Sequence, residues 1–192
     1  MLDVDDDGHV SRAARKLLGA LADSGVVVPP RVLDAGASAG GFTQVALDAG
    51  AEQVYAVDVG HDQLAGSLRI DPRVVVHERT NLRDLTLGHV DGTPVGLAVG
   101  DVSFISMRLL LVPILAVVDE GGEALLLVKP QFEVGRDGLD RHGVVRDPGL
   151  RRRAVGGVME GAAALGWHTA WTGESRLPGA GGNVEYFVRL VR

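Results

Sequence analysis

Lysine is rare in this sequence, and its two occurrences could carry proton chemistry. Of the nineteen lysines and arginines in the 192-residue chain, only Lys16 and Lys129 are lysines. A lysine amine can release its proton inside a protein, whereas an arginine guanidinium cannot. One interpretation is that a sequence that otherwise uses arginine keeps these two amines for their chemistry. On this count alone, chance survival in an arginine-rich composition is an equal alternative.

Polar side chains end four apolar segments of the chain. Asp34, Asp58, Asp101 and Lys129 each follow a short run of apolar residues or glycine. In an open α/β sheet, ligands bind outside the carboxyl ends of the parallel strands. A single acid at such a place is often only a turn residue. Four in succession favour one crevice that all four side chains face.

A glycine-rich turn predicts a nucleotide-type cofactor site. Gly36, Gly40 and Gly41 lie between an apolar strand and an apparent helix, where the backbone can approach a ligand closely. A dinucleotide fingerprint has glycine at its first, third and sixth positions, but here the third position is Ser38, which disfavours a nicotinamide oxidoreductase. Asp58, at the end of the next strand, can accept hydrogen bonds from both hydroxyls of an adenosine ribose. The alternative is a plain, tight connection between a strand and a helix.

Alternating strand and helix patterns must position these side chains. Short apolar runs recur between segments with helical spacing, which predicts an α/β fold with a mostly parallel sheet and helices on both faces. A first helix is expected at residues 11–24, capped by Ser11 and ended by Gly25, and a last helix from about Asp147 and Pro148. The seven expected strands are residues 31–34, 53–58, 74–77, 96–101, 124–129, 168–172 and 184–191.

Composition excludes several classes of protein. The chain has no cysteine, which rules out disulfides and thiolate metal sites, and its six histidines lack the spacing of zinc ligands. We therefore expect no metal. The strongest apolar stretch, residues 109–118, is about half of the roughly 20 residues that span a bilayer, and Pro113 interrupts it. No membrane segment is expected, and a reducing cytoplasm fits the lack of cysteine best.

Charge and length bear on the partner and on the domain organisation. The chain carries a formal charge of −6, whereas a free-standing nucleic-acid binder is usually basic. Basic residues nevertheless gather at residues 12–16, 69–83 and 151–153, the last of which is most simply a solvated face. The length suits one domain. We expect a flexible, acidic leader at residues 1–10 and one α/β domain at residues 11–192.

Seven segments with distinctive sequences are spread along nearly the whole chain. They are His9-Val-Ser-Arg-Ala-Ala-Arg-Lys-Leu17, Asp34-Ala-Gly-Ala-Ser-Ala-Gly-Gly-Phe-Thr43, Glu78-Arg-Thr-Asn-Leu-Arg-Asp84, Asp101-Val-Ser-Phe-Ile-Ser106, Val128-Lys-Pro-Gln-Phe-Glu133, Gly143-Val-Val-Arg-Asp-Pro148 and Gly182-Asn-Val-Glu-Tyr186. Through them, residues 10–192 resemble the methyltransferase domain of the TlyA family, often labelled hemolysin A, within the FtsJ-like ribose methyltransferases. The resemblance implies a Rossmann-like methyltransferase fold, S-adenosylmethionine as cofactor, and ribosomal RNA or a ribosomal subunit as partner. It also implies a cytidine 2′-hydroxyl as the methyl acceptor.

The same resemblance implies a catalytic set, Lys16, Asp101, Lys129 and Glu185, with Glu185 in the last strand. Both lysines of the chain belong to it, so composition and resemblance select the same two residues. Methyl transfer from a sulfonium to an alcohol needs an aligned hydroxyl and benefits from a base. Lys129 is the expected base, because burial and the neighbouring Lys16 cation can make an amine less basic. The carboxylates are expected to orient the amines and the hydroxyl, and an exchange of roles between the lysines stays open.

For the cofactor, the resemblance implicates Gly40 and Phe42 in the glycine-rich turn, Asp58 at the ribose and Asn81 near the adenine. At Asn81 the broader family tends to have aspartate, and a neutral amide can still bond to the adenine edge. The full expected cofactor-binding set is Asp34, Gly36, Ser38, Gly40, Gly41, Phe42, Asp58, Asn81 and Asp101.

Three alternatives remain at this stage. Full-length relatives begin with an S4-type RNA-binding domain, whereas only a short leader precedes residue 11 of this sequence. One alternative is therefore an RNA-associated, cofactor-binding protein without catalysis. The nicotinamide oxidoreductase is a second. A membrane-acting protein, as the hemolysin label suggests, is disfavoured because no amphipathic or spanning segment is evident. Neither the modified nucleotide nor the oligomeric state is predicted.

Overall fold

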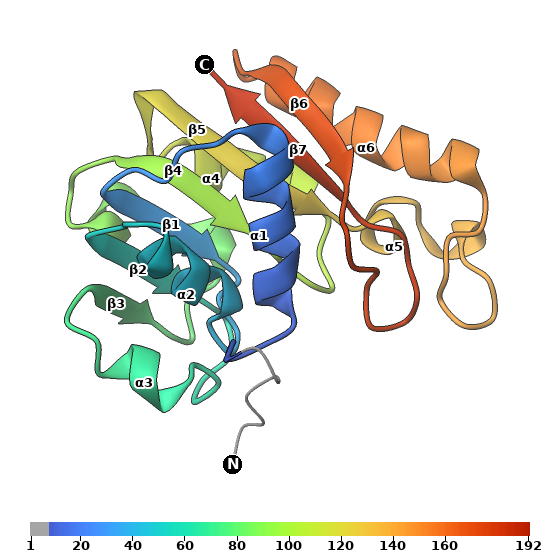
Figure 1. The fold of residues 1–192 in the computed structure, drawn as a ribbon. Helices are drawn as coiled ribbons and strands as arrows, with labels where there is room; N and C mark the ends of the chain where they lie inside the picture. Colours follow the sequence, from blue (N-terminus) through green and yellow to red (C-terminus); the bar gives the residue numbers. More distant parts are fainter. Residues whose placement is uncertain (1–7) are drawn as a thin grey trace.

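Seven strands form one sheet at the centre of the computed structural model, which describes residues 8–192 (Figure 1). The strands are β1 (Arg31–Ala35), β2 (Gln53–Val57), β3 (Val74–His77), β4 (Val95–Gly100), β5 (Val118–Val128), β6 (His168–Glu174) and β7 (Tyr186–Val191). Their order across the sheet is β3-β2-β1-β4-β5-β7-β6. All pairs from β3 to β5 are parallel, and β7 runs antiparallel to β5 and β6. The predicted mostly parallel, seven-stranded sheet is confirmed.

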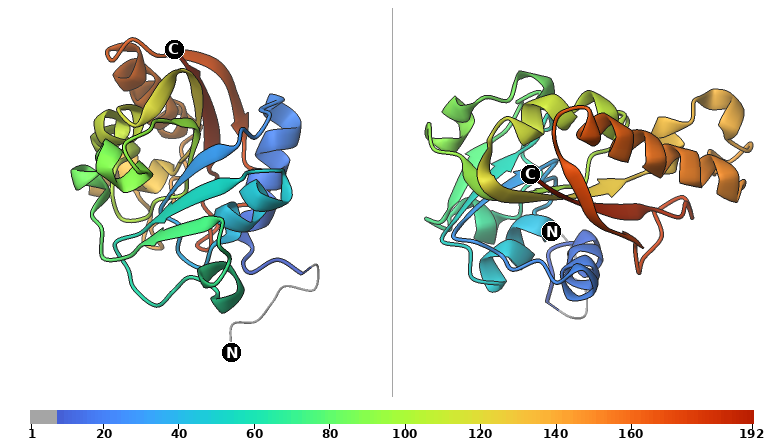
Figure 2. Two further views of the ribbon diagram at one scale, coloured as in Figure 1. Left: turned by 90° about the vertical axis from the view of Figure 1, so that its left-hand side faces the viewer. Right: turned by 90° about the horizontal axis from the view of Figure 1, so that it is seen from above.

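Helices cover both faces of this sheet, as predicted (Figure 2). The α-helices are α1 (Ala13–Ser24), α2 (Gly41–Asp48), α3 (Gly66–Arg69), α4 (Leu111–Leu115), α5 (Pro130–Glu133) and α6 (Pro148–Ala163). Four short 3-10 helices connect them: η1 (Leu82–Asp84), η2 (Leu87–Val90), η3 (Met107–Leu109) and η4 (Arg136–Gly138). Helices α1 and α2 pack on one face, and α4 and α6 pack on the other.

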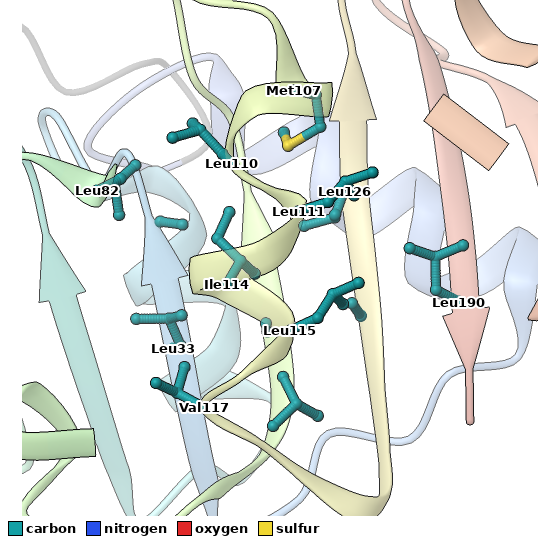
Figure 3. Packing of buried hydrophobic residues seen from close by; sticks show 14 of the residues in the cluster. Leu33, Leu82, Met107, Leu110, Leu111, Ile114, Leu115, Val117, Leu126 and Leu190 are labelled. Atoms are coloured by element: carbon teal, nitrogen blue, oxygen red, sulfur yellow. The ribbon is translucent and has the colours of Figure 1, made fainter. Parts of the chain in front are cut away.

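Two hydrophobic cores result, one on each side of the sheet. Successive strand side chains point to opposite faces, so in β1 Val32 packs with α1 and α2, while Leu33 packs with α4. Figure 3 shows the second core, where Ile114 of α4 lies over the strands. Because the central strands are buried on both faces, they are near-continuous apolar runs, as parallel strands require.

The first helix begins differently from the prediction. Its N-cap residue is Arg12, without a capping side chain, and Ser11 is not the cap. The reason is tertiary: the Ser11 hydroxyl packs so tightly against Gly41, at the start of α2, that any side-chain carbon at Gly41 would overlap it. At the other end, Gly25 terminates α1 in the left-handed conformation, as expected, with a φ of 69°.

The start of α6 agrees with the prediction, whereas the starts of β5 and β7 differ from it. Asp147 caps α6 by accepting a hydrogen bond from the Gly149 amide at 2.6 Å, and Pro148 is the first helical residue. Strand β5 begins six residues earlier than expected, at Val118. Its polar first half gives no apolar signal, and it joins β4 through the Val95–Val118 pair before the register shifts. Strand β7 begins at Tyr186, so Glu185 precedes it and does not lie on it.

The expected leader lies mostly outside the described residues. Of residues 1–10, the structure describes 8–10, and the Gln44 side chain of α2 binds their backbone. Its amide oxygen accepts from the Val10 amide at 2.9 Å, and its amide nitrogen donates to the Gly8 carbonyl at 3.2 Å. Residues 8–10, which lead into α1, are therefore held against α2.

Candidate functional site

The candidate site lies at the carboxyl ends of β1 and β4, where the strand order reverses direction. This switch point is where open α/β sheets bind ligands. Gly36 follows β1 and has a φ of 89°, a conformation that glycine adopts without strain. A side-chain carbon at Gly36 would lie 2.9 Å from the Asp101 carbonyl oxygen, which follows β4. Only glycine lets these two strand ends approach so closely.

A cavity of about 490 Å³ opens at this point. Its size suits a drug-sized or nucleoside-sized ligand. Five of the predicted cofactor residues line it: Gly36, Ser38, Asp58, Asn81 and Asp101. The remaining lining comes from Val59, Gly60, Gln63, Leu82, Val102, Ser103, Phe104, Ile105 and Leu110.

Asp58 organises one end of this cavity. It directly follows β2, and its two carboxylate oxygens accept hydrogen bonds from the Ser38 amide at 2.8 Å and the Gly60 amide at 2.7 Å. The carboxylate thereby joins the glycine-rich turn to the loop after β2. Each oxygen retains a lone pair for a ligand hydroxyl. Asn81 sits further along the wall, where its side-chain oxygen accepts from the Arg83 amide at 3.0 Å.

A smaller cavity of about 200 Å³ adjoins the first. The two share Gly36, Ser38, Asp101 and Ser103 as lining residues. The smaller one also reaches Lys129 and is walled by residues 11–13 at the start of α1, with Gly41 and Phe42 from α2. A ligand in the large cavity and a second ligand in the small one would therefore meet beside Asp101 and Lys129.

The four predicted catalytic residues converge at this junction. The Lys16 amine donates to Glu185 Oε2 at 2.6 Å and lies 4.0 Å from Asp101 Oδ2. The Lys129 amine lies 2.5 Å from Asp101 Oδ1 and donates to the Ser103 hydroxyl at 2.8 Å. The Asp101 carboxylate thus stands between the two amines. The order Glu185, Lys16, Asp101, Lys129 alternates negative and positive groups.

Burial makes this alternation necessary. Glu185 is 2% exposed, Lys16 6% and Lys129 9%. A buried charge is tolerated only when it is paired and hydrogen-bonded, and here two amines balance two carboxylates. Gln131 adds a hydrogen bond from its amide nitrogen to Glu185 Oε1 at 3.3 Å. The arrangement holds both amines in fixed positions, and only Lys129 of the two lines the smaller cavity.

Asp34 does not face the crevice, and this expectation was wrong. It is fully buried inside β1 and accepts a hydrogen bond from the Thr43 hydroxyl of α2 at 2.7 Å. Burial raises the pKa of Asp34 to about 7, partly offset by the Thr43 hydrogen bond. Asp34 therefore links β1 to α2, the two elements that the glycine-rich turn connects.

None of the other predicted turn residues lines the large cavity. Gly40 lines neither of them, because its open face is filled by Leu68 and Leu64. Phe42 lines the smaller cavity, and its ring stacks on Phe187 of β7 with centroids 6.1 Å apart. Of the predicted cofactor residues, Gly41 and Phe42 thus lie nearer the second cavity.

Sequence reasoning missed three residues of the site: Ser103, Phe104 and Gln131. Ser103 and Gln131 have common polar side chains, and only the tertiary fold brings them to Lys129 and Glu185. Phe104 is 91% exposed, although it is a large aromatic residue, and its φ of 66° is unusual outside glycine. It lines the large cavity, and its ring contacts that of Phe132. The sequence signal that could have identified Phe104 is its position three residues after Asp101.

The described residues contain neither a membrane-spanning helix nor a cluster of metal ligands. No helix among residues 8–192 is long and apolar enough to cross a bilayer. Within the same range, no three histidine or carboxylate side chains gather as metal ligands would.

Comparison with known proteins supplies the evolutionary context. A family model described as FtsJ-like methyltransferase matches residues 9–192. The 16S/23S rRNA (cytidine-2′-O)-methyltransferase TlyA of Mycobacterium tuberculosis is 52% identical over 182 residues, which cover 94% of this chain and 68% of the relative.

Solved structures agree. A Lactococcus lactis protein that carries the name hemolysin is 40% identical, with a TM-score of 0.91 over 95% of this chain and 88% of that one. An S-adenosylmethionine-dependent methyltransferase from Mesorhizobium loti, 16% identical, has a TM-score of 0.62 over 92% of this chain and 98% of its own. At that identity the likeness concerns the fold alone, which is the Rossmann-like methyltransferase fold.

Proposed function

The chain belongs to the FtsJ-like methyltransferase family, and from this we propose that it methylates a ribose 2′-hydroxyl of ribosomal RNA, with cytidine as the target nucleoside. The observation that carries the proposal is the meeting of two lysines and two carboxylates where the two cavities join. A ribosomal substrate would place this activity in the cytoplasm.

S-adenosylmethionine is the proposed cofactor, and the large cavity fits it. The volume is of the right order for a nucleoside-type ligand. Asp58 offers acceptors for ribose hydroxyls, Asn81 offers an amide for a base edge, and Gly36 leaves backbone room beside Asp101. When bound, this cofactor supplies a methyl group on a positively charged sulfur.

The residues of the chain then have separate tasks. The 2′-hydroxyl enters through the smaller cavity, which only Lys129 of the two lysines lines. Lys129 Nζ acts as the base in its neutral form: it releases its own proton to solvent and then accepts the proton of the hydroxyl. Asp101 holds Lys129 on one oxygen and faces Lys16 with the other, which fixes the direction of the amine. Lys16 and Glu185 form the buried ion pair of the catalytic set. Alignment of the hydroxyl contributes alongside proton removal.

The direct test is transfer of a tritiated methyl group from S-adenosylmethionine to purified, unmodified ribosomal subunits. Digestion of the RNA to nucleosides followed by mass spectrometry should identify 2′-O-methylcytidine. A methyl group on a base would contradict the proposal. Cofactor binding without any transfer would favour the non-catalytic alternative.

Asp58 provides a test of the cofactor site by itself. Asp58→Asn removes the carboxylate that accepts hydrogen bonds from two loop amides and, in this proposal, from the ribose hydroxyls. Calorimetry should therefore show S-adenosylmethionine binding about tenfold to hundredfold more weakly. Asp62→Asn is the matched control: it removes the same charge from a side chain that is 82% exposed and outside the cavity lining, and it should bind normally. Equal affinity of the two variants would refute the assignment.

A further inference from the structure

A third cavity lies on the α6 side of the sheet, apart from the two already described. It measures about 240 Å³ and is lined by Arg108, Glu133, Val134, Arg153, Ala154 and Gly157. Arg108 belongs to η3, Glu133 ends α5, and the last three residues lie on α6. None of these six residues lines the large or the small cavity of the active site.

Two unpaired cations converge on this cavity. Across residues 8–192, no carboxylate pairs with the guanidinium of Arg108 or Arg153, and neither guanidinium makes a hydrogen bond. The one carboxylate in the lining, Glu133, is already engaged: its oxygens accept from the Ser106 hydroxyl at 2.6 Å and the Met107 amide at 2.7 Å. With two guanidinium groups against one carboxylate that is hydrogen-bonded elsewhere, the cavity lining carries a net positive charge.

The helix geometry explains why the two arginines meet. Arg153 and Gly157 are four residues apart on α6 and so lie on the same face. Glycine is disfavoured inside a helix, and at Gly157 the Arg108 side chain of η3 lies beside the helix. A side-chain carbon at Gly157 would lie 3.5 Å from Arg108 Cδ and 3.7 Å from its Nε.

The cavity is also connected to the catalytic segments. The loop after β4 carries Asp101 and Ser103 and continues into η3, which presents Arg108. Lys129 directly precedes α5, which ends at Glu133, and the two Glu133 hydrogen bonds tie α5 to the start of η3. A ligand in this cavity would therefore lie against the two segments that hold Asp101 and Lys129.

We propose that Arg108 and Arg153 bind a backbone phosphate of the RNA strand that carries the target nucleoside. The inference rests on the proposed function and adds a second anchor for its substrate. Arginine forks suit phosphate oxygens in geometry and charge. Contacts of this kind position a nucleic acid without reading its sequence. This site gives the acidic chain a local means of holding an anionic strand beside its active site.

Arg153→Gln and Arg152→Gln form a matched pair for the test. Both arginines are exposed neighbours on α6, neither guanidinium has a partner among residues 8–192, and only Arg153 lines the cavity. Loss of one phosphate contact lowers the slope of log affinity against log salt by about 0.7 for a single strand, which is about fivefold in affinity at 0.1 M salt. Arg153→Gln and Arg108→Gln should therefore raise the KM for unmodified subunits about fivefold. Their kcat and cofactor affinity should match the unaltered chain, as should every parameter of Arg152→Gln.

Three outcomes would overturn or relocate the idea. Equal KM changes in Arg152→Gln and Arg153→Gln would show a diffuse charge effect and refute the site. If inorganic phosphate protects the unaltered chain from heat more than Arg153→Gln, while both methylate subunits with the same KM, the cavity binds free phosphate and the RNA assignment is wrong. If the unaltered chain transfers no methyl group to any subunit, the proposed function itself fails, and this result is separate from the comparison of the variants.

Discussion

Lys129→Arg is expected to lower methyl transfer to ribosomal subunits by about 10²–10⁴-fold while the affinity for S-adenosylmethionine stays unchanged. Arginine keeps the positive charge beside Asp101 but cannot give up its proton to act as a base. The lost factor is the size that general-base catalysis usually contributes. Single-turnover assays with saturating cofactor would measure the chemical step, and calorimetry would confirm that the cofactor still binds.

Lys16→Arg is the comparison that gives this result its meaning. Lys16 pairs with Glu185 and does not line the smaller cavity, so a permanent cation there should preserve more of the activity. Near-normal turnover of Lys129→Arg together with a large loss in Lys16→Arg would show that the two lysines exchange the roles assigned here. Equal losses in both would indicate that shape, and not proton transfer, limits the reaction.

The largest effect on stability should come from Lys16→Met. This change leaves the carboxylate of Glu185, which is 2% exposed, without its cation and with only the amide of Gln131 as a partner. Removing one partner of a buried ion pair costs about 3–5 kcal/mol. For a chain of this size, the midpoint of thermal unfolding should fall by roughly 10 °C at neutral pH.

The double change Lys16→Met with Glu185→Gln separates stability from catalysis. It removes the unpaired charge together with its partner, so the melting midpoint should recover most of the loss. Methyl transfer should nevertheless stay low, because the buried Lys16–Glu185 ion pair of the catalytic set is gone. Recovery of turnover along with stability would show that Lys16 acts only through folding.

Much of this protein follows from local sequence. Apolar runs separated by helical spacing predict the sheet, because strands buried on both faces have few alternatives to apolar side chains. The two lysines stand out in the composition, the family resemblance selects the same two, and both lie in the site. Asp58 and Asp101 could be placed at strand ends, because apolar segments stop there.

Other features were decided only by tertiary structure. Asp34 and Asp58 both end apolar runs, but Asp34 is followed by one more strand residue and faces α2, because side chains alternate between the two faces of a sheet. The position of Lys16 depends on how α1 seats against the sheet, which brings it to Glu185 across 169 residues of sequence.

The phosphate cavity shows the same limit. It needs Arg108 of η3 to lie beside Gly157 of α6, a helix that the chain reaches some forty residues later. Local patterns determine which residues form strands and helices, because those depend on near neighbours. Which side chains meet depends on packing between distant elements, and no spacing along the chain encodes it.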